Sequence, residues 1–286
     1  MPDDQRDTVL ISVPTLSALI AAGQAPAILA VRSDDTSCPR PFAQAPRIPG
    51  AIDTELGTDF ASPSHPVHGS RPLPAIEALQ AAARRWGLRL DQPVVVYDHD
   101  GNLQAARAWW VLKWAGFTNV LMLDGGFPAW SAAGLAVTDT VPAPATPSDV
   151  ILRAGGMPEL DIDAAASLAR SGVLLDSRIA PNYRGGATSP GTPPRGHIPG
   201  ARNIPAPDNL TVDGHFADLE TLRRLYAAAK ADGSAPVGVY CGAGVSAAHN
   251  VAVLMMLGIE APMYPGSWSA WSADPRRPVA IGPEPG

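Results

Sequence analysis

The chain has 286 residues, enough for one large domain or two of ordinary size, and hydrophobic residues make up 46% of it, which allows a substantial core. Lys and Arg number 21 against 27 Asp and Glu, a formal net charge of −6, and no basic run stands out; this argues against nucleic acid or an anionic membrane as a partner. Because Lys113 and Lys230 are the only lysines, a site that holds an anion must rely on arginine, main-chain N–H groups or a helix terminus.

The chain begins with acidic and polar residues, without the basic start and apolar run of a secretion signal. No stretch approaches the roughly 18 uninterrupted apolar residues of a membrane span. The chain has two cysteines, Cys38 and Cys241. A single disulfide between them would be an unusual way to stabilise so long a chain, so both are interpreted as free thiols. We therefore expect a cytoplasmic, monomeric protein that binds neither membranes nor nucleic acid.

Short apolar runs typical of buried strands alternate with helical segments along the chain. In order, the predicted elements are strands at 27–31 and 93–97, a helix at 103–115, strands at 120–123, 173–175 and 236–240, a helix at 246–257 and a strand at 261–264. Gly116 and Gly258 follow the two helices, as expected for C-terminal caps. This alternation favours an α/β fold built on parallel sheets with helices on both faces.

Segments of the first half recur in the second half in the same order, which indicates an internal duplication. The matched pairs are 29–32 with 175–178, 47–51 with 197–201, 94–97 with 237–240, and 125–130 with 266–271. Between the halves lies a proline-rich stretch with little to bury, which favours an extended, semi-rigid linker. The sequence therefore predicts two tandem domains, residues 1–138 and 157–286, joined by a linker at 139–156.

The second half carries a cysteine where a buried strand ends and a glycine-rich turn leads into a helix. Cys241 follows the strand at 236–240 and opens the segment Cys-Gly-Ala-Gly-Val-Ser of residues 241–246. Small residues let this backbone curl tightly, so that several N–H groups and the helix N-terminus would stabilise a thiolate or a persulfide. Ligands of parallel sheets bind at this end of the strands. We interpret Cys241 as a reactive, reachable thiol rather than a structural cysteine, and Cys38, in a polar proline-rich loop, as an incidental surface thiol.

Four motifs of the second half together resemble those of tandem rhodaneses, the thiosulfate and 3-mercaptopyruvate sulfurtransferases, and are close to the actinobacterial two-domain members. The motifs are Asp-Ser-Arg at 176–178, Gly-His-Ile-Pro-Gly-Ala at 196–201, the loop at 241–246, and Gly-Ser-Trp-Ser-Ala-Trp at 266–271. The resemblance implies two rhodanese-like domains, the second catalytic and the first without its nucleophile. Asp98 stands at the position that matches Cys241, so the first domain is expected to be inactive. A lost cysteine is a simpler explanation of residues 97–100 than a metal site, and no metal is predicted.

The resemblance also implies a sulfurtransferase without a cofactor, in which a persulfide on Cys241 carries the sulfur. The implied substrate-binding residues are those of the loop, Gly242, Ala243, Gly244, Val245 and Ser246, with Arg178, Arg184 and Arg195 as candidate anion-binding arginines. Arg178 fits a structural pairing with Asp176 equally well. His65, His68 and Arg71, in the loop before Pro72, are candidates to reach the site from the first domain.

The resemblance implies a small anionic sulfur donor, and cyanide or a thiol, including a protein thiol, as acceptor. Gly242 lacks the basic residue that usually follows the cysteine in the thiosulfate branch. The mercaptopyruvate branch typically carries an arginine at Asn182, another at 190–191 and a hydroxyl residue at Ala243, and this chain departs from that pattern at all three places. Thiosulfate is therefore the favoured donor, and 3-mercaptopyruvate is the alternative.

Two more distant interpretations stay open. A non-catalytic carrier would keep the fold and deliver persulfide to one partner protein. A cysteine phosphatase also uses a thiolate in an anion-binding loop, but its loop ends in an arginine that grips phosphate, and Ser246 stands near that place here. The phosphatase is therefore the weaker of the two.

Overall fold

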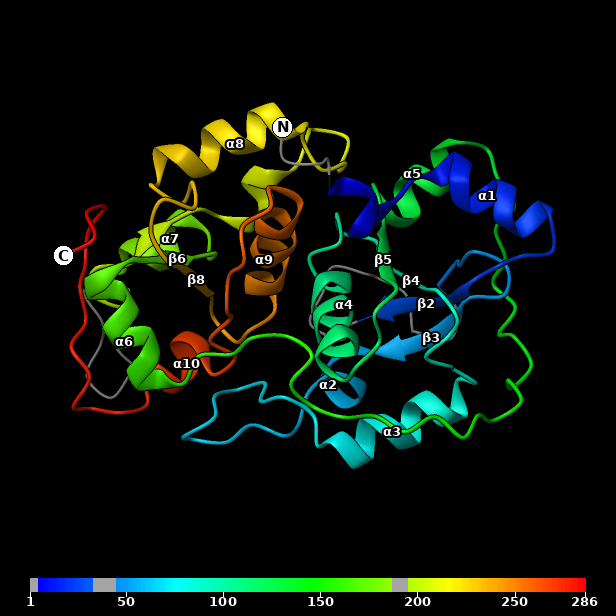
Figure 1. The fold of residues 1–286 in the computed structure, drawn as a ribbon, viewed down its shortest axis with the longest axis horizontal. Helices are drawn as coiled ribbons and strands as arrows, with labels where there is room; N and C mark the ends of the chain where they lie inside the picture. The colour runs from blue at the N-terminus through cyan, green and yellow to red at the C-terminus, as the bar shows by residue number, and fades with distance from the viewer. Residues whose placement is uncertain (1–4, 33–44, 187–194) are drawn as a thin grey trace.

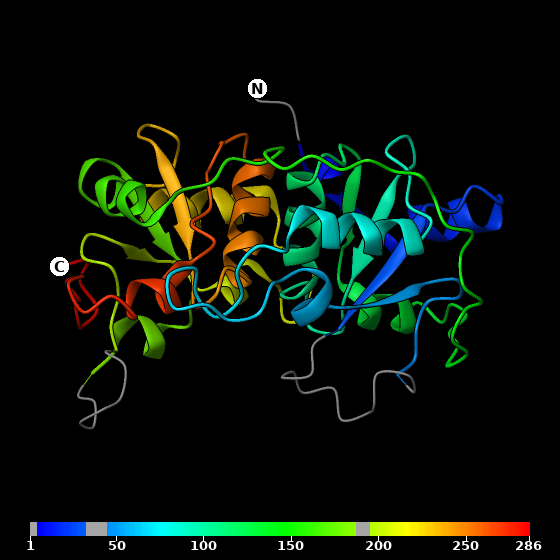
Figure 2. The same cartoon turned by 90° about the horizontal axis from the view of Figure 1, so that it is seen from below.

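The computed structural model describes residues 5–32, 45–186 and 195–286, so Cys38 and residues 190–191 lie outside the described residues. The chain forms two α/β halves that lie side by side, each built around its own sheet (Figures 1 and 2). None of the described helices is long and apolar enough to cross a membrane.

The sheet of the first half runs in the order β1-β5-β4-β2-β3, and each pair of neighbouring strands is parallel. Its strands are β1 (Leu10–Ile11), β2 (Ala27–Arg32), β3 (Ile52–Glu55), β4 (Val94–Tyr97) and β5 (Val120–Leu123). Its helices are η1 (Arg6–Thr8), α1 (Val13–Ala21), α2 (Leu56–Asp59), α3 (Ile76–Arg85), α4 (Ala105–Trp114) and α5 (Gly126–Ala132). The Ser12 side chain accepts a hydrogen bond from the Thr15 N–H, which fixes the start of α1.

The sheet of the second half is also parallel and runs in the order β7-β6-β8. Its strands are β6 (Val173–Asp176), β7 (Arg202–Asn203) and β8 (Val237–Tyr240). Its helices are α6 (Ile162–Ser171), α7 (Ala180–Arg184), η3 (Ala206–Asn209), α8 (Leu219–Ala228), α9 (Ser246–Met256) and α10 (Ser267–Trp271). The carboxylates of Asp161 and Asp218 cap the N-termini of α6 and α8.

Helices cover both faces of each sheet, as the apolar strands predicted. In the first half, α3 and α4 pack on one face, and α1 and α5 pack on the other. In the second half, α8 and α9 lie on one face, and α6 and α10 lie on the other. Successive strand residues alternate between these layers: Leu174 packs with α6, and Leu175 packs with the opposite layer. The expected fold class is confirmed.

The duplication is visible in matching hydrogen bonds. The N–H of Ile48 donates to the Tyr97 hydroxyl at 3.0 Å, and the N–H of Ile198 donates to the Tyr240 hydroxyl at 3.1 Å. Tyr97 ends β4 and Tyr240 ends β8. The residues that follow these tyrosines, 98 and 241, therefore occupy equivalent places in the two halves.

One predicted strand is wrong. Residues 261–264 do not form a strand, and Met263 makes only single bridges, to Val239 and to Glu159. Pro262 has no N–H to donate, so a continuous ladder cannot form at this edge of the second sheet. The predicted helices agree more closely with the structure. Helices α4 and α9 end before Gly116 and Gly258, and both glycines have a positive φ.

The proline-rich stretch at 139–156 contains no helix or strand, but it packs along the first half. Val150 and Leu152 are buried, although the composition suggested little to bury. The Arg84 side chain donates to the Val150 carbonyl at 2.9 Å, and the Leu152 N–H donates to the Gln80 side chain at 3.0 Å. These contacts attach the stretch to α3.

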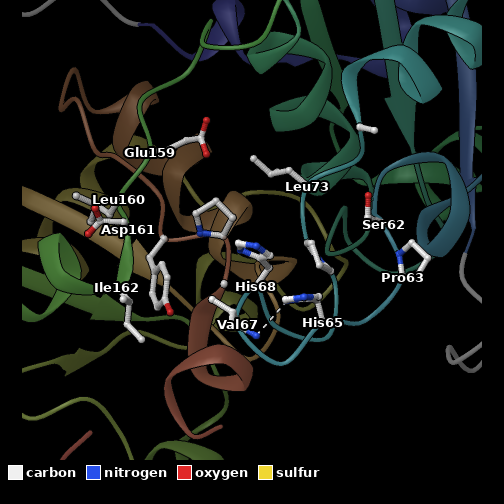
Figure 3. A pocket seen from close by; sticks show the side chains of 15 residues that line it. Ser62, Pro63, His65, Val67, His68, Leu73, Glu159, Leu160, Asp161 and Ile162 are labelled. Carbon is white, nitrogen blue, oxygen red and sulfur yellow. Dashed lines mark hydrogen bonds between the residues drawn. The ribbon is translucent and has the colours of Figure 1, made fainter. Parts of the chain in front are cut away.

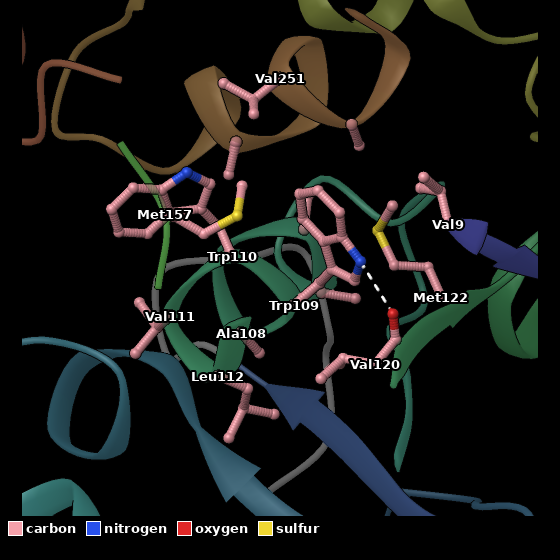
Figure 4. Close-up of a cluster of buried hydrophobic side chains, with 14 of the residues drawn as sticks. Val9, Ala108, Trp109, Trp110, Val111, Leu112, Val120, Met122, Met157 and Val251 are labelled. Atoms are coloured by element: carbon pink, nitrogen blue, oxygen red, sulfur yellow. Dashed lines mark hydrogen bonds between the residues drawn. The ribbon is translucent and has the colours of Figure 1, made fainter. Parts of the chain in front are cut away.

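The two halves meet where α4 packs against α9, and one apolar core runs through both (Figure 4). Trp109 and Trp110 of α4 are fully buried, and Val251 of α9 lies over them in Figure 4. The Trp109 indole donates to the Val120 carbonyl at 3.0 Å. Because α4 follows the loop after β4 and α9 follows the loop after β8, this packing brings each loop next to the other half.

At this interface, His249 should make the protein sensitive to acid. Its ring is fully buried, and Nε2 donates to the Gly101 carbonyl at 3.2 Å. Burial lowers the pKa of His249 to about 4. Since the unfolded chain takes up this proton near pH 6.5, the unfolding free energy should fall by on the order of 3 kcal/mol as the pH decreases from 6.5 to about 4. Burial also lowers the pKa of His99 to about 4, which adds to the loss.

Urea unfolding of His249→Gln at about pH 7 and about pH 4.5 checks this expectation. The variant should lose less stability on acidification than the wild type, whereas His68→Gln, at an exposed histidine, should match the wild type. Equal acid losses in the wild type and His249→Gln would contradict the assignment.

Candidate active site

Cys241 opens the loop between β8 and α9, at the carboxyl end of a strand of the second sheet. Its N–H donates to the Ser267 hydroxyl at 3.1 Å, and its carbonyl accepts the Trp268 N–H at 2.9 Å. The first half repeats this contact, because the Phe127 N–H donates to the Asp98 carbonyl at 2.8 Å. The motif at 266–271 therefore folds back onto the cysteine loop and closes it.

The thiol itself is covered. Cys241 is only 1% exposed, and the Ser267 hydroxyl lies 4.0 Å from its sulfur. This differs from the reachable thiol that the sequence favoured, because the local pattern around residue 241 does not show that a later segment folds over it. Gly242 and Ala243 are partly exposed, so the loop itself reaches the surface.

Ser267 is held against the cysteine in an unfavourable backbone conformation. Its φ is 53°, in the left-handed region, and its counterpart in the first half is a glycine, Gly126, with a φ of 58°. The Ser267 hydroxyl accepts the Cys241 N–H and donates to the Tyr264 carbonyl at 2.9 Å. A non-glycine residue in such a conformation costs about 1–3 kcal/mol and is typical of functional sites.

The main-chain amides that follow the cysteine are free to bind a ligand. Within the described part of the chain, the N–H groups from Gly242 to Ala247 donate to no carbonyl and no side chain. The last of them belong to the first turn of α9, whose N–H groups have no partner inside the helix. A run of free amides that leads into a helix N-terminus is an arrangement that binds anions.

The first half shows this kind of loop with an anion already in it. Asp98 is buried, and each of its two carboxylate oxygens accepts two main-chain hydrogen bonds of 2.7–2.9 Å. The four donors are the N–H groups of Asp100, Asn102, Gln104 and Ala105. Burial raises the pKa of Asp98, and the amides oppose that rise. The loop therefore binds a negative group at the place equivalent to Cys241, which favours the lost-cysteine interpretation of residues 97–100 over a metal site.

Gly244 fixes the shape of the cysteine loop. Its φ is +72°, and a Cβ added there would lie 2.6 Å from the Pro265 carbonyl oxygen and 2.9 Å from Nη1 of Arg107. We expect Gly244→Ala to lower the unfolding free energy by about 1–3 kcal/mol, because both the φ and the contacts are unfavourable. Gly242→Ala is the matched control, since its Cβ would meet nothing nearer than the Arg178 Cδ at 3.8 Å. Thermal unfolding checks this, and equal melting temperatures for the two variants would contradict it.

Of the three arginines predicted from the sequence, Arg178 lies beside the loop, next to Gly242. Its Nε bonds both carboxylate oxygens of Asp176 at 3.0 Å, and its Nη2 donates to the Gly196 carbonyl at 2.7 Å. Burial disfavours its charge, but the Asp176 carboxylate outweighs burial and raises the pKa of Arg178. The guanidinium also lies 4.7 Å from the Trp268 ring. Arg178 is therefore paired with Asp176, and its positive charge still lies beside the cysteine loop.

Arg184 and Arg195 are not brought to the cysteine. Both side chains are exposed, and neither contacts residues 241–246 among the described residues. They flank the segment 187–194, and their main chains lie close together, since a Cβ added at Gly185 would lie 2.5 Å from the Arg195 carbonyl. Their role as anion-binding residues stays a prediction.

One side chain that the sequence did not suggest for the site belongs to the first half and contacts the cysteine loop. Arg107 of α4 is fully buried, and its Nη1 donates to the Gly244 carbonyl at 3.0 Å. On a predicted helix, a single arginine is usually a surface charge. The signal that could have revealed it is that the surrounding residues are apolar on every side of the helix, which indicates a buried helix.

A cavity of about 740 Å³ lies where the loop at 62–75 of the first half meets the second half (Figure 3). His65, His68 and Gly266 are among its lining residues. The Ser70 N–H donates to the Ser269 hydroxyl at 2.9 Å, so this loop does reach across to the second half. Cys241 does not line the cavity, which ends at the segment that covers the thiol.

The comparisons with known proteins agree with this geometry. The family model of the rhodanese-like domain matches twice, at residues 12–133 and 162–274. The chain is 40% identical over 281 residues to a putative thiosulfate sulfurtransferase, SseB, of Mycobacterium tuberculosis, covering 97% of this chain and 98% of that protein. It is 42% identical over 254 residues to a probable 3-mercaptopyruvate sulfurtransferase of Pseudomonas aeruginosa, covering 84% of this chain and 86% of that protein.

Solved structures share the fold. The crystal structure of YnjE superposes with a TM-score of 0.83 at 24% identity, over 99% of this chain and 70% of that one. A 3-mercaptopyruvate sulfurtransferase from Leishmania major gives a TM-score of 0.81 at 25% identity, over 95% of this chain and 76% of that one.

Proposed function

The chain belongs to the rhodanese-like family and is a sulfurtransferase, and we propose that Cys241 carries the sulfur between a small anionic donor and a thiophilic acceptor. The observation that carries this proposal is the run of free amides after Cys241, in the loop equivalent to the one that holds the Asp98 carboxylate in the first half. A thiol at the start of an anion-binding loop suits both a thiolate and a persulfide. The sulfurtransferase names of the relatives support the same class of reaction.

The reaction proceeds in two displacements. The Cys241 thiolate attacks the outer sulfur of thiosulfate, the S–S bond of the donor breaks, and sulfite leaves with its electron pair. The resulting persulfide anion then passes its terminal sulfur to cyanide, which gives thiocyanate, or to a thiolate, which gives a new persulfide. Cys241 returns as a thiolate. The amides from Gly242 to Ser246 stabilise negative sulfur at each stage, so the catalysis is electrostatic and needs no acid or base.

The covered thiol adds a step before the chemistry. Because Cys241 is 1% exposed, a donor can reach its sulfur only when the loop or the closing motif at 266–271 moves. The partly exposed Gly242 and Ala243 carry no bulky side chain to block that approach. We therefore expect small donors and reagents to react faster than bulky ones.

We propose thiosulfate as the donor. Main-chain amides and the positive charge of Arg178 at the edge of the loop can bind a compact dianion such as thiosulfate. 3-Mercaptopyruvate also presents a carboxylate and a keto group that need their own partners. Asn182 is exposed on α7 and Ala243 has no hydroxyl, so the described residues lack two groups that are typical of that branch. 3-Mercaptopyruvate is the alternative donor.

Intact-mass measurement tests the proposal. After incubation with thiosulfate and removal of excess donor, the protein should gain one sulfur atom and lose it again when cyanide is added. The Cys38→Ser variant should gain the sulfur as the wild type does. No gain from either donor would reject the proposal, and faster turnover with 3-mercaptopyruvate at matched concentration would correct the donor.

The covered thiol favours one second candidate, a carrier for a partner protein. If docking of a protein acceptor opens the loop, transfer to that protein thiol should be fast while turnover with cyanide is slow. Comparable rates with small and protein thiols would instead favour the enzyme with small acceptors.

A further inference from the structure

The interface between the halves contains two equivalent contacts that differ in charge. Arg107 of α4 donates to the carbonyl of Gly244 in the cysteine loop at 3.0 Å. His249 of α9 donates to the carbonyl of Gly101, the matching glycine of the first half's loop, at 3.2 Å. Both glycines have a positive φ, of 72° and 61°. Each half therefore holds the other half's loop at the same place, once with a guanidinium and once with an imidazole.

Arg107 is a buried cation that contacts only neutral groups. Its Nε donates to the Phe60 carbonyl at 3.2 Å, and its Nη2 donates to the carbonyls of Arg71 and Pro72 at 3.1 and 3.2 Å. Among the described residues, no carboxylate lies within ion-pair distance of it. A fully buried charge without a counter-charge is costly, and most buried charges are paired. The arrangement therefore calls for an anion nearby.

The guanidinium keeps its charge at neutral pH. Burial lowers the pKa of Arg107 to about 10. The charged and titratable groups that act on it are Cys241, Arg71 and Glu159. A negative sulfur on Cys241 opposes the effect of burial, Arg71 adds to it, and Glu159 opposes it more weakly. The strongest anionic influence on Arg107 thus comes from the site of the reaction.

The contact at the other loop has no such charge. Burial lowers the pKa of His249 to about 4, so this ring is neutral at neutral pH. The loop that it holds already contains the carboxylate of Asp98, which accepts hydrogen bonds from four main-chain amides. Of these two contacts across the interface, only the one to the cysteine loop therefore carries a positive charge at neutral pH.

We propose that Arg107, supplied by the domain without a nucleophile, is a positioning residue for sulfur transfer: it holds the Gly244 carbonyl across the interface and stabilises the anionic sulfur on Cys241. The inference rests on the proposed function of Cys241 and gives the first domain a role in the reaction. Removal of the charge should slow the reaction of Cys241 with a small electrophile at about pH 7 by about 10- to 100-fold and move the rise in rate to higher pH.

The test measures the alkylation rate of Cys241 by iodoacetamide between about pH 6 and pH 10, in a Cys38→Ser background. Arg107→Gln and Arg107→Met remove the charge, Arg107→Lys keeps it, and Arg6→Gln is the matched control. Arg6 also bridges the halves: it donates to the carbonyls of Phe216 and Ala217 and forms an ion pair with Asp124, and none of its described contacts is with the cysteine loop. We expect the uncharged variants to be slow, Arg107→Lys to recover most of the rate at about pH 7, and Arg6→Gln to match the wild type.

Folded, uncharged variants with the wild-type pH profile would overturn the inference, while wild-type sulfur uptake would leave the role of Cys241 intact. If neither uncharged variant folds, Arg107→Lys decides. A fully buried lysine loses its proton at a lower pH than arginine. Its alkylation rate should therefore fall below that of the wild type at the intermediate pH values where the lysine has lost its proton and the thiol is still partly protonated. A curve that matches the wild type over the whole pH range would overturn the inference.

Discussion

A Cys241→Ser variant should lose sulfur transfer by roughly 10⁴-fold or more with either donor. The serine hydroxyl stays protonated in this pH range and cannot hold a sulfur atom as a persulfide. The variant should fold, because oxygen for sulfur is a small change, although burial of the new hydroxyl costs about 1 kcal/mol if it finds no partner. The measurements are turnover with thiosulfate and cyanide, and intact mass after thiosulfate alone.

Cys38→Ser is the control, and it should turn over like the wild type. The accessibility of the thiol is a second readout, since Cys241 is 1% exposed. In the Cys38→Ser background, a small methanethiosulfonate should react faster than a bulky aromatic disulfide. Transfer that persists in Cys241→Ser would show that another group carries the sulfur, and equal reactivity with both reagents would show that the thiol is open in solution.

The elements that bear on the reaction follow from local sequence signals. Short apolar runs placed β4 and β8, and helical segments followed by glycines placed α4 and α9, all within one or two residues. The recurrence of the Ile-Pro-Gly-Ala and Val-x-Val-Tyr segments revealed the duplication. These features depend on residues close together in the chain. The same signals placed Cys241 at the end of a strand and at the start of a helix, where the structure has it.

The features that sequence analysis missed depend on contacts between distant segments. The cover over Cys241 comes from Ser267, and the charge beside its loop comes from Arg107 in the other half. Neither residue is near Cys241 in the chain, and no local periodicity links them. The burial of Val150 and Leu152 is similar, because their partners lie on α3. Tertiary packing decides such features, and local pattern does not.

The second large effect is expected at Asp98, where Asp98→Ala should lower the unfolding free energy by on the order of 3–5 kcal/mol. The carboxylate accepts four main-chain hydrogen bonds, and alanine would leave all four amides without an acceptor. The hydrogen bonds from Asn102 and Ala105 are buried, and these two N–H groups cannot turn to water, so the loss of their acceptor is costly. For a chain of this size, the melting temperature should fall by roughly 10 °C.

Asp98→Asn should fall between alanine and the wild type, because its oxygen still accepts two amides while its NH2 group faces the other two donors. The control is Asp100→Ala at the exposed neighbour, which should change the unfolding free energy by no more than about 0.5 kcal/mol. Below their melting temperatures, all three variants should still take up sulfur from thiosulfate, because Asp98 serves the first domain's loop and Cys241 lies in the second. A small stability change in Asp98→Ala would mean that other groups satisfy these amides. Loss of sulfur uptake in a folded Asp98 variant would mean that the first loop also shapes the site.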